Sequence, residues 1–250
     1  MKKLKTLLLL TVLLFACSPA AHSQVLITLL LGDKLNSDKL EFGLDGGVNF
    51  LNMSNTPNAK MLPDWNLGFY FDFKLKEKLF LHTGVRVKAK MGTKGLDPYS
   101  LNSIYLDSVF ATGSVDRKIN YFNVPVLIRY RIVDYFHAEG GIQLGLRYTA
   151  FDNFKNTVVD KDDLEFANSI KDSLKRLDAG LQFGLGYKLK QGKGMTISAD
   201  YYFGLVDVNN FIAGSQKNSA IYLNVSVPIG KGKAEKKAAG KAAEEQGEDK

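Results

Sequence analysis

Apolar and polar residues alternate through most of the chain after residue 40. In FLHTGVRVKAK (80–90), small or apolar residues take every second position, and His82, Gly84, Arg86, Lys88 and Lys90 lie between them. A period of two places successive side chains on opposite faces of a β-strand. Seven more segments show this pattern: 40–50, 65–76, 121–132, 136–148, 176–190, 195–205 and 220–229. Each is about long enough to cross a membrane as a tilted strand.

The connections between these segments alternate between short and long. Residues 76–78, 133–134 and 190–194 are turn-like, whereas the longer connections cover 53–64, 92–118, 150–175 and 206–218. In an up-and-down meander, this order places all short turns at one end of the strands and all long loops at the other. The sequence therefore predicts an all-β fold, an eight-stranded antiparallel up-and-down barrel.

Volume decides which face points inward. The apolar faces carry about six residues per strand, many of them Phe, Leu or Tyr. The interior of an eight-stranded barrel is only just wide enough to be filled by side chains. The polar faces are rich in glycine and fit a narrow interior better. We therefore expect the apolar face to point outward into lipid, in a transmembrane barrel with short periplasmic turns and long extracellular loops. A soluble lipocalin-like barrel is the alternative.

The polar faces carry charges of both signs, and buried charges require partners. We expect an ion-pair network that fills the lumen, since a pore lining would favour one sign. Its predicted members are Glu41, Asp45, Asp72, Arg86, Arg129, Arg131, Glu139, Arg147, Asp178 and Asp200, with Lys88 beside them.

The two ends of the chain differ from the alternating part. Residues 1–23 combine a basic start, an apolar stretch and small polar residues, which predicts a secretory signal peptide cleaved before Gln24. Lipidation at Cys17 is the alternative. Residues 24–39 are expected to form a periplasmic segment before the barrel domain at 40–230. The Lys/Ala/Glu-rich residues 231–250 predict a disordered periplasmic tail.

Composition gives little sign of chemistry. The net charge is +7, but the basic residues are spread along the chain, so no nucleic-acid partner is expected. His82 and His137 lie on the polar face near short turns and are interpreted as lumen filling. We expect no catalytic residue, no metal site and no cofactor.

Two long loops suggest further features. Apolar residues at helical spacing from Leu164 to Leu177 predict a short helix, with the acidic run 160–165 at its start. A calcium site is the alternative for that run, although the EF-hand pattern is missing. The loop 92–118 is the first choice for a ligand or partner surface. Nearby lysines and Arg117 are candidates to meet anionic lipid head groups.

The stretches 29–50 and 121–130 (YFNVPVLIRY), with the eight alternating segments, resemble the PorT-like outer-membrane β-barrel family. The resemblance implies the outer membrane of a diderm bacterium. In such a barrel, the order of short turns and long loops is expected to place both termini in the periplasm. It implies contact with outer-membrane lipid and lipopolysaccharide, and a possible periplasmic or secretion-complex protein partner. The expected function is non-enzymatic: a membrane anchor, a loop-mediated binding surface or a secretion-complex accessory. The alternatives are a narrow transport channel and, less favoured, a lipid-modifying enzyme.

Overall fold

The computed structural model describes residues 35–37, 39–157, 159, 164–192, 194–209 and 214–229. The predicted signal peptide, most of the segment 24–39, the acidic residues 160–163 and the tail 231–250 lie outside these residues. The strands are β1 (Leu40–Met53), β2 (Leu62–Lys74), β3 (Leu79–Leu96), β4 (Ser114–Val133), β5 (Phe136–Asn156), β6 (Leu164–Ser169), β7 (Leu177–Lys188), β8 (Thr196–Gly204) and β9 (Asn218–Pro228). The helical segments are α3 (Ile104–Phe110), η1 (Lys171–Ser173) and α4 (Leu189–Gly192).

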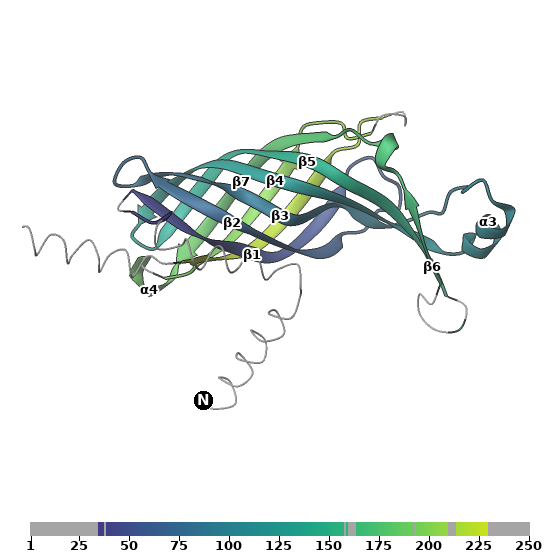
Figure 1. Ribbon diagram of the computed structural model, residues 1–250, viewed down its shortest axis with the longest axis horizontal. Helices are drawn as coiled ribbons and strands as arrows, with labels where there is room; N and C mark the ends of the chain where they lie inside the picture. Colours follow the sequence, from purple (N-terminus) through teal and green to yellow (C-terminus); the bar gives the residue numbers. More distant parts are fainter. Residues whose placement is uncertain are drawn as a thin grey trace, which may run out of the picture.

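Eight of these strands close into one antiparallel barrel (Figure 1). β1 pairs with β2 on one side and with β9 on the other, and the pairing of β4 with β5 completes the ring. β6 pairs only with the far end of β5, so it adds an edge outside the ring. The predicted eight-stranded up-and-down barrel is therefore confirmed.

Along each barrel strand, apolar side chains exposed on the outer surface alternate with side chains buried in the lumen. In β8, Ser198, Asp200 and Tyr202 are buried, whereas Ile197 and Phe203 expose about half of their surface. The same contrast holds around the ring, where Leu144, Phe183 and Leu223 are exposed and the polar residues opposite them are buried. The prediction that the apolar face points outward is confirmed.

The alternation within β3 is interrupted, contrary to the prediction from 80–90. Arg86 pairs with Asn123 but Ala89 pairs with Tyr121, so β3 holds one extra residue at this point. Such a β-bulge reverses the faces of the residues that follow. Ala89 is consequently buried and Lys88 is exposed. The interpretation of Lys88 as a lumen residue was wrong.

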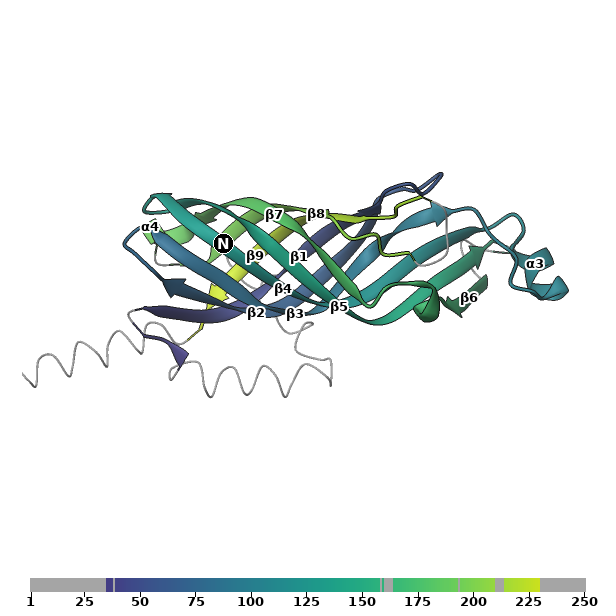
Figure 2. The ribbon, with the colours of Figure 1, turned by 90° about the horizontal axis from the view of Figure 1, so that it is seen from above.

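The loops 92–118 and 150–175 are much more regular than expected. β3 continues to Leu96, β4 begins at Ser114, and β5 continues to Asn156, where it pairs with β6. These extensions run past the barrel and carry α3 at their tip (Figure 2). We call the described residues of 89–118 and 149–169 the arm.

The arm has a hydrophobic core of its own. Phe154 and Val115 are completely buried there, with Leu96 and Phe110 nearly so. Leu106, Leu164 and Phe166 pack against this cluster, so that α3 and β6 are both held by it. The arm is therefore a packed extension of the sheet and not an irregular loop.

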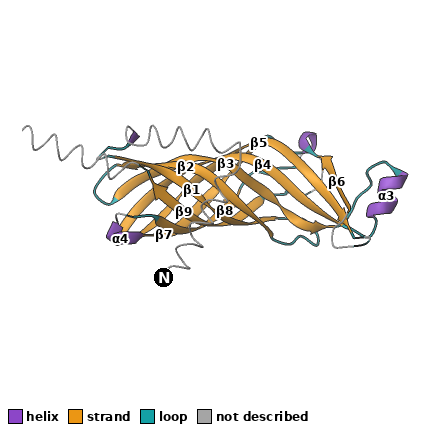
Figure 3. Cartoon of the chain, turned by 60° about the horizontal axis from the view of Figure 1, so that its bottom comes forward, coloured by secondary structure: helices purple, strands orange, loops and turns teal. Residues whose placement is uncertain are grey.

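The helix predicted from Leu164 to Leu177 is wrong. Residues 164–169 form β6, whose backbone is satisfied by pairing with β5, and Leu177 begins β7. Ile170 and Leu174 turn into the barrel mouth instead of lying on one helix face. The described helical segments lie at the two ends of the barrel, with α4 at the short-turn end (Figure 3). No helix among the described residues has the length and apolar character needed to cross a membrane.

Candidate functional site

Arg129 is the centre of a buried ion-pair cluster near the short-turn end of the lumen. Its Nε lies 2.7 Å from Oε2 of Glu139, and its Nη1 lies 2.6 Å from Oδ2 of Asp72. The other carboxylate oxygen of Asp72 lies 2.6 Å from Nδ1 of His82. β2, β3, β4 and β5 each supply one member, because their inward positions meet at the same height. This cluster contains three of the predicted network residues.

Arg86 occupies the middle of the lumen. It pairs weakly with Asp45, at 3.4 Å, and donates from Nη1 to Oε1 of Gln143 at 2.9 Å. Its guanidinium also lies 4.6 Å from the centre of the Tyr222 ring. The Arg86 side chain, on β3, thus contacts β1, β5 and β9. It therefore extends across this part of the lumen.

Glu41 forms a third pair, with a partner outside the predicted set. Nζ of Lys188 lies 2.7 Å from Oε1 of Glu41, which also accepts a hydrogen bond from the Tyr70 hydroxyl at 3.0 Å. Lys188 lies at the end of β7, where the alternation placed it on the polar face. Sequence reasoning did not include it because the register between β1 and β7 was unknown.

Four predicted residues are in the lumen without a described carboxylate–guanidinium pair. Arg131 stacks on the Phe80 ring at 4.5 Å, and Arg147 donates to the backbone oxygens of Leu174 and Lys175. The remaining two accept hydrogen bonds from neutral side chains: Asp178 from Asn218 and Asp200 from Ser198. The predicted network thus consists of smaller groups, and Asp200 lies between Glu139 of the Arg129 cluster and Arg86.

Tyrosines fill much of the remaining lumen, and sequence reasoning missed their importance. Tyr70, Tyr121, Tyr202 and Tyr222 are all buried, with at most 2% of their surface exposed. Each occupies a polar-register position of its strand, which was the available signal. Gly43 makes room for one of them, since a Cβ there would collide with the Tyr70 ring and with the backbone oxygen of Val227.

An apolar cluster closes the lumen at the long-loop end. Its completely buried members include Leu51, Met91, Ile119 and Val208, and Ile170 and Leu174 cover them from the segment after β6. The hydrogen bonds from Arg147 hold that segment in place. We call this cluster the seal. Polar clusters below it and the seal above both fill the lumen with side chains.

Both histidines belong to the Arg129 cluster, and the calcium alternative falls mostly outside the described residues. His82 is bonded to Asp72, and Nε2 of His137 lies 3.8 Å from Glu139, both within the Arg129 cluster. Among the described residues, no group of His, Cys, Asp and Glu could hold a metal ion. Most of the acidic run proposed for calcium lies outside those residues.

The outer surface of the barrel carries two aromatic belts. At the long-loop end, the Phe122 and Tyr148 rings lie 4.7 Å apart, and Nζ of Lys88 lies 3.7 Å from the centre of the Trp65 ring. At the short-turn end, Tyr135 and Tyr187 form a similar pair at 5.3 Å. Such belts flank the apolar band of membrane barrels. Lys90 bonds to Asp64 at 2.6 Å just beyond the first belt, where the surface becomes polar.

The arm continues beyond that belt. β4 has seven residues from Ser114 to Asn120, which span about 20 Å at the rise of a β-strand. Asp152 in the arm is completely buried and forms a bidentate pair with Arg117, at 2.9 and 2.8 Å. The Tyr99 hydroxyl donates to the same carboxylate. Burial and the neighbouring Asp152 charge raise the pKa of Tyr99 to about 12, so this donor keeps its proton at neutral pH.

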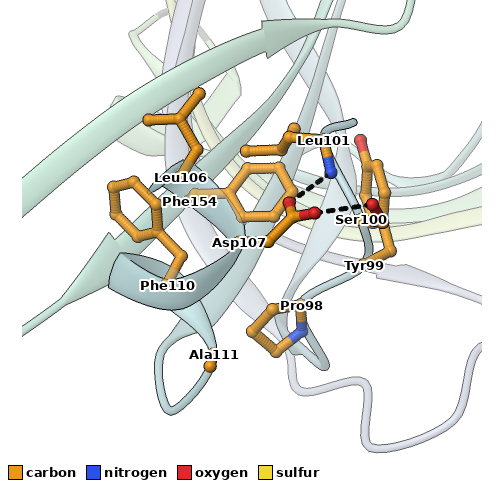
Figure 4. A pocket seen from close by; sticks show the side chains of 9 residues that line it. All are labelled: Pro98, Tyr99, Ser100, Leu101, Leu106, Asp107, Phe110, Ala111 and Phe154. Atoms are coloured by element: carbon orange, nitrogen blue, oxygen red, sulfur yellow. Dashed lines mark hydrogen bonds between the residues drawn. The ribbon is translucent and has the colours of Figure 1, made fainter. Parts of the chain in front are cut away.

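A small cavity lies at the tip of the arm, between α3 and residues 98–101. It has a volume of about 200 Å³ and is lined by aromatic side chains and one carboxylate, that of Asp107 (Figure 4). Asp107 accepts hydrogen bonds from the Leu101 backbone N–H at 2.6 Å and from the Ser100 hydroxyl at 2.7 Å. These bonds hold the pKa of Asp107 below its usual range. This is a side-chain-sized site on the surface predicted to bind a ligand or partner.

Comparison with known proteins gives one family and several distant structural likenesses. Residues 33–210 match the model of the outer membrane protein beta-barrel domain. Ail, the attachment invasion locus protein of Yersinia pestis, has 13% identity and a TM-score of 0.40, with 77% of this chain and 100% of Ail covered. Neisserial surface protein A has 9% identity and a TM-score of 0.45, covering 75% and 97%. The Pseudomonas putida toluene transporter TodX has 12% identity and a TM-score of 0.30, covering 78% and 66%. No curated protein matches the chain.

Proposed function

The chain belongs to the outer membrane protein beta-barrel family, and from this premise we propose that it is a closed barrel that anchors the arm in the membrane and presents its tip as a binding surface. One contrast carries the proposal. The lumen is occupied by ion pairs, tyrosines and the seal, whereas the arm tip exposes large apolar side chains, with Ile104 93% and Tyr105 74% exposed. Large apolar side chains that are exposed together at a projecting tip suit a surface that contacts another molecule.

We propose that the arm faces outward from the cell. The short turns, the first residue of β1 and the last residue of β9 share one end of the barrel. In membrane barrels, short turns face the periplasm and long loops face the exterior. Both chain termini are then periplasmic, as expected from the order of short turns and long loops.

Lipid contact is a second part of the proposal. The outer leaflet would meet the aromatic belt at Trp65, Phe122 and Tyr148. Lys88 is exposed at that belt, and Lys118 lies on the same outer face of β4, next to buried Ile119. These ammonium groups suit the phosphates of lipopolysaccharide.

We propose no catalytic role, because His82 and His137 are enclosed by the Arg129 cluster and do not reach the lipid surface. The PorT-like subfamily and a role beside a secretion complex rest on the resemblance of residues 121–130, which form the inner half of β4. A periplasmic partner would have to bind at the short-turn end.

Photo-crosslinking in intact cells tests the binding surface. A photoreactive phenylalanine derivative replaces Tyr105 at the tip, and the matched control replaces Tyr201, which is 47% exposed on the barrel wall. We expect the Tyr105 probe to yield a macromolecular adduct and the Tyr201 probe to yield only lipid. If both probes yield lipid alone, the tip is not a binding surface.

The narrow channel remains the second candidate, and conductance in planar bilayers tests it. With the seal in place, we expect no unitary conductance from the purified protein. Steady, reproducible channel currents would show that the lumen opens, and would replace the anchor proposal with a transport function.

A further inference from the structure

The cavity at the arm tip combines an apolar wall with a charge that has no partner nearby. Phe154 and Phe110 form its floor, with ring centres 5.9 Å apart, and the Tyr99 ring packs edge-on against Phe154 at 5.0 Å. Among the described residues, Asp107 bonds only to the Ser100 hydroxyl and the Leu101 N–H, and no cationic side chain pairs with it. Each carboxylate oxygen therefore keeps an acceptor site.

This combination selects for one type of group. An aromatic floor accepts the methylene stem of a long side chain, and a carboxylate at the opening accepts an ammonium donor. A neutral apolar group would leave the carboxylate without a cationic partner, and the carboxylate would repel an anion. The volume of about 200 Å³ admits one side chain and not a larger ligand.

The surroundings of the cavity favour a polypeptide over a free amine. Ile104 and Asp107 on α3 and its C-cap residue Ala111 are spaced by three and four residues. They therefore lie along one face of this short helix. Ile104 is 93% exposed and Tyr105 is 74% exposed beside the cavity. A chain whose basic residue enters the cavity would cover them with its neighbouring apolar residues.

We propose that the tip of the arm binds a lysine side chain of a partner polypeptide, with the ammonium on Asp107, the stem against Phe110 and Phe154, and flanking apolar residues on Ile104 and Tyr105. This rests on the proposed function, since it gives the tip surface a ligand class. It requires no change in the arm, because the cavity is already open.

Methyl NMR on the full chain, folded in detergent micelles, tests the proposal. The methyl groups of Ala111, Leu101 and Leu106 line the cavity and report on occupation. The probe is acetyl-Leu-Lys-Leu-amide, and its control has norleucine in place of lysine. We expect the lysine peptide to shift these signals and to bind at least about fivefold more tightly than the control, since only it carries the charge. Equal affinities would overturn the proposal.

Variants separate charge from fold. Asp107→Asn should weaken the lysine peptide about fivefold, whereas Asp97→Asn, an exposed carboxylate on the same segment that does not line the cavity, should leave its affinity unchanged. Because Asp107 also holds Leu101 and Ser100, Ala111→Phe is a second variant that fills the cavity with Asp107 intact. Unchanged binding in Ala111→Phe would place the peptide elsewhere and refute the site.

A third probe, butylammonium, distinguishes the source of the amine. If it binds as tightly as the peptide, the site takes small amines and the polypeptide assignment is wrong. If the peptide fails to bind while the Tyr105 crosslink forms, this inference falls and the proposed function stands. If the crosslink is missing while the peptide binds, the cavity accepts a lysine side chain but the tip meets no macromolecule in the cell, so the proposed function falls and the partner polypeptide inferred here falls with it.

Discussion

Replacing a single charged residue in the lumen costs more stability where it leaves a buried charge without a partner. Arg129 compensates two carboxylates, Asp72 and Glu139, and all three are at least 90% buried. Removing one partner of a buried pair costs far more than the pair's net contribution, because the remaining charge stays in a poorly solvating interior. Arg131, on the same strand, stacks on Phe80 and is only half-buried.

Arg129→Met should therefore lower the free energy of unfolding by about 3 kcal/mol. Arg131→Met is the matched control and should lower it by less than about 1 kcal/mol, the contribution of a partly exposed cation–π contact. Urea unfolding in lipid vesicles measures both. Similar losses in the two variants would mean that the Arg129 cluster is not an electrostatic centre.

Glycine is required where a tyrosine lies against the backbone. Gly43→Ala would press its methyl group into the Tyr70 ring and the Val227 backbone oxygen, and we expect a loss of about 2 kcal/mol or more from overpacking. Gly46→Ala lies on the outward register of the same strand, where the nearest atoms would be 3.3 Å away, and should cost less than about 1 kcal/mol. The same unfolding experiment compares them, and a larger loss for Gly46→Ala would contradict the packing described.

At the scale of elements, β3 shows how a single extra residue alters a strand. Before the bulge, Arg86 faces the lumen; after it, Ala89 and Met91 do, and both are buried in apolar surroundings. The reversal allows polar clusters and the seal to share one strand. It also places Lys88 outside, against Trp65.

Cysteine labelling tests this reversal, because the only natural cysteine is Cys17. In a Cys17→Ser background, Lys88→Cys should react with a charged maleimide in intact vesicles, since its side chain is outside at the aromatic belt. Arg86→Cys should be protected, because position 86 is enclosed in the lumen. Protection at 88 with reaction at 86 would mean that the alternation continues without a bulge.

Some features of the strands could be predicted from the sequence, and others could not. Alternation identified all eight barrel strands, and volume identified their faces, since both are local or bulk properties. The bulge at 87–88 has no sequence signature, so the prediction for Lys88 failed. Ion-pair partners such as Glu41 and Lys188 depend on the register of strands distant in sequence. The apolar residues at 164–177 do recur at helical spacing. In the structure, however, residues 164–169 pair with β5, and Ile170 and Leu174 pack in the seal.

For the whole molecule, we expect closure of the sheet to increase the resistance to unfolding. The pairing of β4 with β5 removes the ring's free edges, and the strands interlock through lumen side chains. Unheated protein in dodecyl sulfate should therefore migrate differently from boiled protein on electrophoresis, and fractionate with the outer membrane. Identical migration together with recovery from the soluble periplasm would contradict a membrane barrel.

The separation of the arm core from the seal has a consequence for how such a protein can change. The two clusters share no residue: one is built around Phe154 and Phe110, the other around Leu51, Met91 and Ile119. We therefore expect replacements at the tip to leave the packing of the membrane-embedded body unchanged. Exchanging residues 97–113 for a foreign recognition sequence would remove Phe110 from the arm core but no residue from the seal, so we expect insertion into the bilayer to continue.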